Sequence, residues 1–341
     1  MPDTRIAFAF AGWPEEVEAI RHLVEHDGDE VVTLTLDLGQ GEDLDGLREQ
    51  ALEAGAVRAH VMDLRETLAR DFLLPALQAC GASDGGVPLD RELRLATVVK
   101  ALAEVAGMEN AHYLAHGGSA DDASLHGHFE ELVQTLRPDS GGFVWPASLF
   151  DSDTRPSEQR ATVSVIGREL RLPAGASDAE ISGVYRVTRE RTATPDGPAR
   201  VEIAFEQGVP TSVNGVRLPF PELLDSLDTI VGVHGVGRFD GLLGAYSAAY
   251  DRPMRHIGEA PAVLVLALAY DALERRVWPA ELVDLKAQLA ATFRGLLRRG
   301  RWFSPTRQAI SAFIAQADQL VTGTVTLELF KGSCRVLTLT K

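Results

Sequence analysis

The stretch IAFAFAGWPEEV, residues 6–17, passes from an unbroken apolar run into a proline followed by two acids. Residues 6–11 predict a buried strand, since a short continuous apolar run is typical of a strand covered on both faces. Pro14, Glu15 and Glu16 predict the start of a helix, because proline fits the first helical position and acids are favourable at a helix N-terminus. A buried strand that turns directly into a helix indicates an α/β domain with a parallel sheet.

The same alternation continues through the first half of the chain. We expect strands at about 30–38, 57–62, 112–115 and 143–145, and helices at about 42–54, 64–80 and 89–106. Strands separated by helices predict a doubly wound parallel sheet, with any ligand at the carboxyl ends of its strands.

Beyond about residue 155 the pattern becomes antiparallel. Strands are expected at 162–172, 183–188 and 201–205, a β pair at about 322–339, and helices at about 219–231, 259–275, 279–298 and 305–320. Asn214-Gly215 predicts a hairpin, because Asn-Gly accepts the positive φ angles of a type I′ turn. We therefore expect an α/β domain over residues 1–155 and an α+β domain over residues 156–341.

The charge balance limits the classes of partner. The chain of 341 residues has 33 Lys and Arg against 49 Asp and Glu, a net charge of −16. This argues against nucleic acid or an anionic membrane as the main partner, since both need a cationic face. No apolar run reaches the roughly 18–20 residues that span a bilayer, and the N-terminus lacks a signal-peptide pattern. The two cysteines, Cys80 and Cys334, provide no disulfide framework or cysteine metal site. We expect a cytoplasmic protein.

Short motifs with a common order extend over nearly the whole chain. They are DLGQGED at 37–43, FLLPAL at 72–77, AHG at 115–117, FEQGVP at 205–210, HGVGR at 234–238, EAPA at 259–262, WFSP at 302–305 and VTGTV at 321–325. Together they resemble the argininosuccinate synthase family. The resemblance implies a PP-loop (adenine nucleotide alpha hydrolase-like) α/β domain, followed by an α+β synthetase and multimerisation domain, in a homo-oligomer (dimer or tetramer). It also implies ATP with magnesium, which adenylates the ureido oxygen of citrulline before the aspartate amine displaces AMP.

The loop after the first strand departs from this family's S-G-G-L-D-T-S. One glycine remains, both hydroxyls are gone, Pro14 lacks an N–H, and Glu15 and Glu16 would face a polyphosphate. At an effective dielectric of ~20, each like-charge contact near 4 Å costs on the order of 4 kcal/mol. We therefore expect no bound cofactor and treat a group of positions as a vestigial nucleotide loop: Ala11, Gly12, Trp13, Pro14, Glu15, Leu36 and Gly117.

The stretches that the resemblance assigns to the amino-acid substrates depart as well. Ser83 and Arg91 replace a tyrosine and a hydroxyl that would meet citrulline, Glu169 replaces a serine, and Gly258 replaces a citrulline-contacting tyrosine. In HGGSADDASLHGHFE, residues 116–130, the family's Asn-Asp pair and arginine have no clear equivalents. The candidate cleft residues are Asp37, Gln40, Ser83, Arg91, His116, Ser119, Asp121 and Asp122.

Several candidates have a simpler interpretation. Asp37 and Gln40 could line a ligand pocket, or they could cap the next helix and hold the turn, which we favour. The group His116, Asp121, Asp122, His126 and His128 contains metal-binding residue types. It lacks a recognised ligand spacing, and His126 and His128 share a face only in an extended segment, so we predict a polar loop and no metal.

Three functions stay open. The first is a noncatalytic or regulatory relative of argininosuccinate synthase that has lost ATP-dependent ligation. The second is an enzyme of amino-acid or specialised metabolism that uses a rebuilt cleft for a small, amino-acid-like ligand. The third is the family activity in altered form. Trp13 either fills the old nucleotide pocket, which favours loss, or forms an aromatic wall for a less charged ligand.

Overall fold

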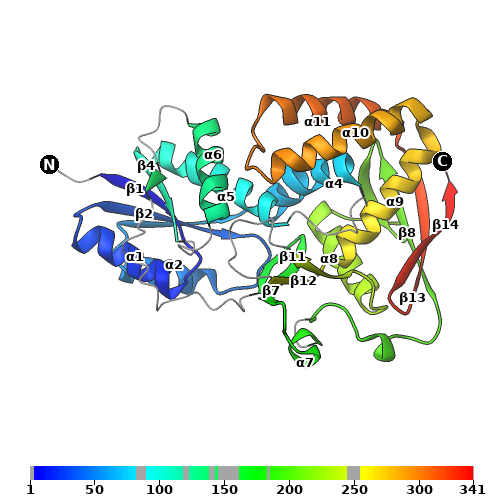
Figure 1. Cartoon of the computed structure of the whole chain (residues 1–341), viewed down its shortest axis with the longest axis horizontal. Helices are drawn as coiled ribbons and strands as arrows, with labels where there is room; N and C mark the ends of the chain where they lie inside the picture. The colour runs from blue at the N-terminus through cyan, green and yellow to red at the C-terminus, as the bar shows by residue number, and fades with distance from the viewer. Residues whose placement is uncertain are drawn as a thin grey trace.

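A five-stranded parallel sheet forms the first half of the molecule (Figure 1). The computed structural model describes residues 4–81, 90–117, 123–137, 143–144, 161–182, 185–243 and 254–340. The sheet has the order β3-β2-β1-β4-β5 and consists of β1 (Arg5–Ala9), β2 (Glu30–Asp37), β3 (Arg58–Asp63), β4 (Tyr113–His116) and β5 (Phe143–Val144). The predicted parallel α/β arrangement is confirmed.

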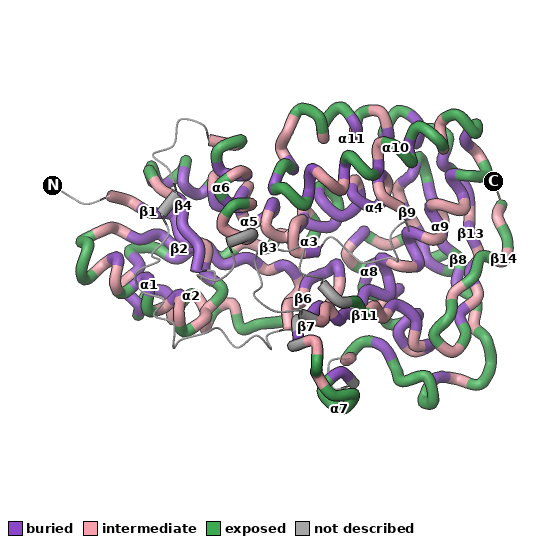
Figure 2. The backbone as a smooth tube through the Cα atoms, viewed as in Figure 1, coloured by how far each residue is buried: buried purple, intermediate pink, exposed green. Residues whose placement is uncertain are grey.

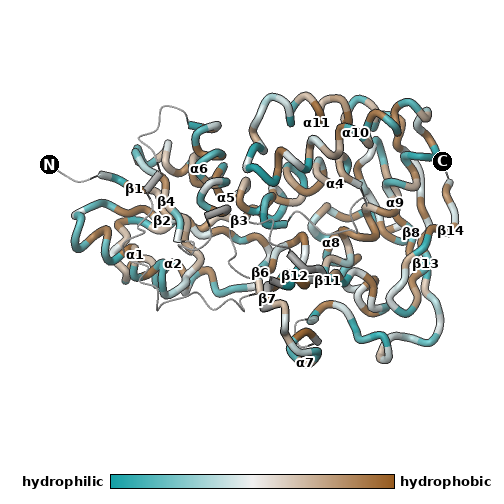
Figure 3. Tube along the Cα trace, in the orientation of Figure 1, coloured by the Kyte–Doolittle hydropathy of each residue, from teal (hydrophilic) through white to brown (hydrophobic). Residues whose placement is uncertain are grey.

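Helices cover both faces of this sheet (Figure 1). The helices are α1 (Pro14–Glu25), α2 (Leu44–Glu53), α5 (Asp90–Met108) and α6 (Ala123–Leu136). Alternate residues of a strand point to opposite faces, so Ile6 and Phe8 pack with α1 and α2, whereas Ala7 belongs to the core that includes α5 and α6. The middle of β2 is accordingly buried (Figure 2) and hydrophobic (Figure 3).

A helical segment with a π-helical centre joins the two halves. It runs through α3 (Arg65–Thr67), the π-helical η1 (Leu68–Leu73) and α4 (Leu74–Cys80). It packs against α10 (Ala280–Leu297) and α11 (Pro305–Ala317) of the second half. Phe72 stacks on Trp302 with ring centroids 5.0 Å apart. One hydrophobic core therefore extends from the parallel sheet into the second half.

The second half contains a five-stranded antiparallel sheet with the order β10-β9-β8-β13-β14. Its strands are β8 (Ala199–Glu206), β9 (Val209–Val213), β10 (Val216–Arg217), β13 (Gly323–Phe330) and β14 (Ser333–Thr340). The helical elements beside it are α8 (Phe220–Gly232), α9 (Pro261–Val277) and η4 (Asp318–Leu320). Asn214 and Gly215 have φ angles of 50° and 81°, which confirms the predicted hairpin turn.

A third sheet, of order β11-β12-β7-β6, corrects two predictions. Its strands are β6 (Thr162–Ser164), β7 (Gly167–Pro173), β11 (Arg238–Leu243) and β12 (Met254–Glu259). The single strand predicted at 162–172 is wrong, because the chain turns at 165–166 and forms the β6–β7 hairpin. The strand predicted at 183–188 is wrong where it is described, since residue 185 is irregular and residues 186–188 form bends between α7 (Asp178–Ser182) and η3 (Arg191–Ala193).

The bends follow from a buried carboxylate. Glu259 is fully buried, and its oxygens accept hydrogen bonds from the backbone N–H groups of Arg186, Val187 and Thr188. Amides that bind a side chain in this way are not available to a neighbouring strand.

Among the described residues, no helix is both long enough and apolar enough to span a lipid bilayer.

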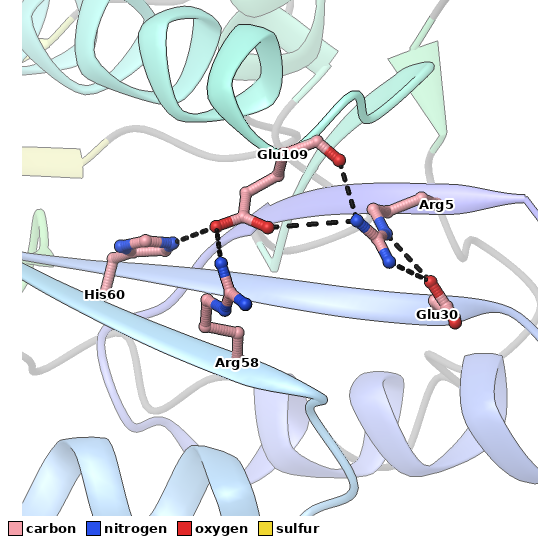
Figure 4. Close-up of polar contacts among 5 residues, drawn as sticks. All are labelled: Arg5, Glu30, Arg58, His60 and Glu109. Carbon is pink, nitrogen blue, oxygen red and sulfur yellow. Dashed lines mark hydrogen bonds and ion pairs between the residues drawn. The ribbon is translucent and has the colours of Figure 1, made fainter.

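An ion cluster connects strands β1 and β3 to the end of α5 at the amino-terminal edge of the parallel sheet (Figure 4). Glu109, at the end of α5, accepts hydrogen bonds on Oε1 from Arg58 Nη1 at 2.7 Å and His60 Nε2 at 2.8 Å. Its backbone oxygen accepts one from Arg5 Nη1 at 2.9 Å. Burial on its own would raise the pKa of Glu109, but the bonds from His60 and Arg58 lower it below its usual value. The cluster ties β1 and β3 to α5 at the edge opposite the strand ends where a ligand would bind.

We expect the substitution Glu109→Gln to reduce the free energy of unfolding by about 1–2 kcal/mol near neutral pH, because charge-assisted hydrogen bonds are lost. A folded-state pKa below the unfolded value means that the contribution is present at neutral pH and is lost as the pH falls through the acid range. Urea unfolding at about pH 7 and about pH 4 measures this. A variant with the unsubstituted stability at both pH values would contradict the assignment.

Candidate functional site

A cavity of about 470 Å³ lies where the strand order of the parallel sheet reverses, between β1 and β4. Ligands of open α/β sheets bind at such switch points, outside the carboxyl ends of the strands. The cavity is bounded by the ends of β1, β2 and β4, by α5 and α6, and by residues 161–163. Its large apolar side chains are Phe10, Trp13, Leu34, Leu36, Leu38, Leu95, Val98, Leu125 and Phe129.

Glu16 occupies the loop that follows β1. Its Oε2 accepts hydrogen bonds from the backbone N–H groups of Ala11 at 2.7 Å and Trp13 at 3.2 Å. Gly12 between them has a φ of 81°, which favours glycine. Amides at a helix N-terminus form a ready-made anion site. In this chain the amides of Ala11 and Trp13 instead bind the side-chain carboxyl group of Glu16, which lies in the first turn of α1.

Gly117, at the end of β4, makes room for this side chain. Glu16 is only 5% exposed, and a Cβ atom at position 117 would lie 2.2 Å from its Cγ. Glycine at 117 therefore permits the close approach of β4 to α1. The contact places a vestigial-loop position, Gly117, directly against the residue that fills the loop.

Burial raises the pKa of Glu16 to about 8, although the hydrogen bonds from Ala11 and Trp13 act in the opposite direction. The group is therefore partly protonated near neutral pH, and the loop amides face an acid whose charge is small. The expectation that both acids would face a polyphosphate is wrong for Glu15, which is half-buried and is not among the residues that line the cavity. Glu16 does line the cavity, but its carboxyl group turns back onto the loop amides.

Sequence reasoning missed the role of Glu16, although a signal for it exists. Trp13 precedes the first helical residue, and a glutamate three positions later commonly accepts a hydrogen bond from the backbone N–H at that capping position. The spacing of Trp13 and Glu16 matches this pattern. It indicates that the second acid of the pair folds back toward the loop.

Trp13 forms part of the cavity wall and does not fill the cavity. Its side chain is half-buried, while about 470 Å³ remains open beside it. The interpretation of Trp13 as a plug is therefore wrong, and the alternative of an aromatic wall is supported. Leu36 lies in the same wall. Pro14, by contrast, is exposed at the first position of α1.

His116 brings a neutral imidazole to the cavity. It ends β4, is 7% exposed, and its Nε2 lies 3.3 Å from Nδ1 of His126, with the Phe129 ring centroid 4.4 Å from its own. Burial lowers the pKa of His116 to about 3, and the charges of His126 and Arg91 act in the same direction. His126 and His128 lie on α6, so the extended segment that would align them does not form. Among the described residues, no three His, Cys, Asp or Glu side chains are grouped to hold a metal ion.

Asp37 and Gln40 hold the turn after β2. Asp37 Oδ1 accepts from the Gly39 N–H at 2.9 Å, and the Gln40 side chain accepts from the Leu38 N–H at 2.7 Å and donates to the Leu36 oxygen at 2.5 Å. The turn-holding prediction is confirmed. The capping prediction is wrong, because Asp43 caps α2 by accepting from the Gly46 N–H at 3.1 Å. Gln40 also lines the cavity, whereas Asp37 does not. The Oδ2 atom of Asp37 lies 3.5 Å from Nε of Arg65.

The other candidate cleft residues contribute less to the described site. Arg91 lies on α5 and is half-buried, close enough for its charge to affect His116, but it does not line the cavity. The remaining four lie outside the described residues: Ser83, Ser119, Asp121 and Asp122.

Arg94, a residue of the cavity wall, belongs to a buried ion cluster behind that wall. Arg94 of α5 donates from Nε to Asp90 Oδ2 at 2.8 Å and from Nη2 to Glu169 Oε1 at 3.3 Å. Glu169 Oε2 lies 3.0 Å from His256 Nε2, and Ser164 donates to Asp90 Oδ1 at 2.9 Å. The side chains of Asp90 and Glu169 are 4% and 8% exposed. Glu169, which replaces a serine of the family pattern, therefore binds protein groups of both halves of the chain.

Charges in the wall are matched within the protein. Arg94 is the only Lys or Arg among the described residues that line the cavity, and two carboxylates hold it. A polyphosphate needs several cationic or N–H donors around it. The loop amides serve Glu16 and the one guanidinium serves Asp90 and Glu169. The described site is suited to a ligand with little charge.

Comparisons with known proteins cover both halves of the chain. The model of the arginosuccinate synthase N-terminal HUP domain matches residues 5–140, and that of the arginosuccinate synthase C-terminal domain matches residues 170–340. Argininosuccinate synthases of Synechococcus elongatus and Bacillus thuringiensis are 33% and 32% identical to the chain. These alignments cover 98% and 97% of this chain and 87% and 86% of the relatives. A solved NAD+ synthetase from Burkholderia pseudomallei is 20% identical, with a TM-score of 0.26, and covers 38% of this chain and 50% of its own.

Proposed function

The chain belongs to the argininosuccinate synthase family, and we propose that it is a noncatalytic member that has lost the ATP-dependent ligation of citrulline and aspartate. The observation that carries this proposal is the Glu16 carboxyl group, which takes the loop amides of Ala11 and Trp13. In the family reaction the corresponding loop has to hold pyrophosphate.

The chemistry explains why this loss is decisive. The ureido carbon of citrulline is a poor electrophile until its oxygen carries a good leaving group, so the reaction needs the nucleotide first. Preorganised donors aimed at the charge that develops in the transition state supply much of the rate enhancement of such reactions. With the amides bound to Glu16 and Arg94 bound to Asp90 and Glu169, the described wall offers few donors for that charge.

The open cavity favours a second candidate, an enzyme of amino-acid or specialised metabolism with a different, amino-acid-like substrate. About 470 Å³ remains beside Trp13, which is within the range of small-molecule sites. Both candidates share the prediction that ATP does not bind, and they differ in whether a ligand occupies the cavity. Retained ligation is a third candidate that would need phosphate donors from residues outside the described part.

We expect calorimetric titration with ATP and magnesium, in the presence of citrulline and aspartate, to show no saturable heat up to about 1 mM nucleotide. Any binding is then weaker than a dissociation constant of about 1 mM, a binding free energy of about −4 kcal/mol. An argininosuccinate synthase with an S-G-G-L-D-T-S loop, titrated under the same conditions, is the positive control. Binding in the micromolar range, or formation of argininosuccinate, would overturn the proposal.

A further inference from the structure

A second cavity, of about 690 Å³, lies between α8 and the β6–β7 hairpin. It is bordered by α8, by the segment 186–189, by the hairpin and by the turn after β2. Its lining residues are Gly39, Val163, Ser164, Gly167, Arg168, Arg186, Val187, Thr188, Arg189, Asp225, Asp228, Thr229 and Val233. Side chains of both charges therefore border one cavity.

The second cavity lies on the other face of the third sheet from Glu169, one of the positions that the family resemblance assigns to the amino-acid substrates. Successive side chains of β7 point to opposite faces of the sheet. Glu169 contacts Arg94, whereas its neighbour Arg168 lies in register with Glu259 of β12 and lines the second cavity. Val163 of β6 borders both cavities, so β6 separates them.

The backbone fixes the cationic side of the second cavity. Glu259 accepts hydrogen bonds from the N–H groups of residues 186–188, and the N–H of Arg189 donates to the backbone oxygen of Gly232 at 2.9 Å. The side chains of Arg186 and Arg189 are exposed, and within the described part of the chain neither guanidinium forms an ion pair or a hydrogen bond. Both groups are therefore held at the cavity and available to a ligand.

The anionic side is one face of α8. Asp225, Asp228 and Thr229 are spaced as neighbours on the same side of a helix. Oδ1 of Asp228 accepts from the Ala262 N–H at 2.8 Å, while its Oδ2 accepts no hydrogen bond from a described residue. Burial raises the pKa of Asp228 to about 7, and the charges of Asp225 and Glu259 act in the same direction. A carboxylate next to a cation would show the opposite shift.

The two sides do not neutralise each other, because no ion pair among the described residues joins Arg186 or Arg189 to either aspartate. A simple anion would meet the carboxylates of α8, and a simple cation would meet the arginines, so each would face like charge. A ligand that carries both a carboxylate and an ammonium group can satisfy both sides.

We infer that this cavity binds an acidic amino acid, whose carboxylates contact Arg186 and Arg189 and whose ammonium group contacts Asp225. The second carboxylate follows from the charge balance of the lining, in which three arginines stand against two aspartates. The inference goes beyond the proposed function and does not depend on it, since none of these residues belongs to the loop that Glu16 occupies.

Ligands that differ in one charged group test the inference. L-Glutamate has two carboxylates and an ammonium group, glutarate lacks the ammonium group, and 4-aminobutyrate lacks one carboxylate. Calorimetry and saturation-transfer NMR near neutral pH measure binding to the full chain. We expect L-glutamate to bind with a dissociation constant below about 1 mM, and both analogues to bind at least about tenfold more weakly.

Charge-specific variants assign the binding to this cavity. Asp225→Asn removes the partner of the ammonium group, so it should weaken binding of L-glutamate about tenfold and leave binding of glutarate unweakened. Arg186→Gln removes a partner of the carboxylates and should weaken binding of both ligands. Both side chains are exposed, so neither substitution disturbs the core.

Two matched controls separate local contacts from a general change in charge. Glu222→Gln on α8 and Arg191→Gln in η3 change exposed side chains of the same charge that do not line the cavity. Both should leave binding of L-glutamate unchanged.

Three outcomes would overturn the inference: L-glutamate does not bind at about 1 mM, glutarate binds as tightly as L-glutamate, or the controls weaken binding as much as the cavity variants do. None of these measurements uses a nucleotide, so such a failure would leave the loss of ligation standing. Turnover of citrulline and aspartate with ATP would instead remove the proposed function and leave this inference standing.

Discussion

Replacing Glu16 by alanine is expected to give the loop between β1 and α1 an affinity for inorganic pyrophosphate that the unsubstituted chain lacks. The substitution releases the N–H groups of Ala11 and Trp13, which point at the vacated position next to the cavity. A hydrogen bond to a charged group contributes about 1.5–3 kcal/mol. One such bond corresponds to a gain of roughly 10- to 150-fold in affinity, measurable by calorimetry.

Two matched variants separate this effect from a general change in charge. Glu15→Ala removes an acidic side chain of the same length one residue away but leaves the amides bound to Glu16, so it should produce less than about a threefold gain in affinity, well under 1 kcal/mol. Glu16→Gln keeps an oxygen in the loop and should produce no gain. Equal pyrophosphate affinity in the Glu15 and Glu16 variants would contradict the assignment of Glu16 as the internal occupant of the loop.

The same residue also predicts a dependence of stability on pH. Burial raises the pKa of Glu16 from the ordinary 4.5 to about 8 in the folded chain. Because the folded chain holds the proton of Glu16 more tightly than the unfolded chain does, protonated Glu16 contributes its full stabilisation below about pH 4.5. That contribution is lost as the pH rises through about 8. Glu16→Gln, which is neutral throughout, should therefore lose less stability than the unsubstituted chain between about pH 6 and pH 9 in urea unfolding.

The sequence located this loop but could not orient its two acids. Pro14, Glu15 and Glu16 correctly predicted where α1 begins, because their effects on a helix N-terminus are local. Which acid turns inward depends on the direction of each side chain around the helix and on the absence of a Cβ at Gly117. That glycine lies on another strand, and only the folded sheet brings it against α1.

Long-range pairing limited the prediction in the second half too. The periodicity of α8 to α11 was sufficient to place these helices, since each is long and its apolar face repeats within the helix. Strands β11 and β12 were missed because their partners, not their own pattern, define them: β12 lies between β11 and β7. The contact of Arg94 with Glu169 spans 75 residues, so no local signal could have indicated it.

Arg94→Met is expected to reduce the free energy of unfolding by about 3–5 kcal/mol, since it leaves the buried carboxylates of Asp90 and Glu169 without their shared counter-charge. Burial already raises the pKa of Asp90 to about 6, and the charge of Arg94 opposes that rise. Without Arg94 the folded chain binds its proton more tightly, so the loss should increase with pH. Urea unfolding at about pH 6 and about pH 8 measures the effect.

Arg65→Met is the matched control, because Arg65 is 49% exposed and pairs with Asp63 at 2.7 Å on the surface. We expect it to change stability by less than about 1 kcal/mol, as exposed ion pairs do. The triple variant Asp90→Asn, Arg94→Met, Glu169→Gln removes all three charges and should regain much of the stability that Arg94→Met loses. A single variant as stable as the Arg65 control would contradict the buried cluster. Recovery in the triple variant would assign the loss to the two unpaired carboxylates, and not to the missing contacts of the arginine side chain.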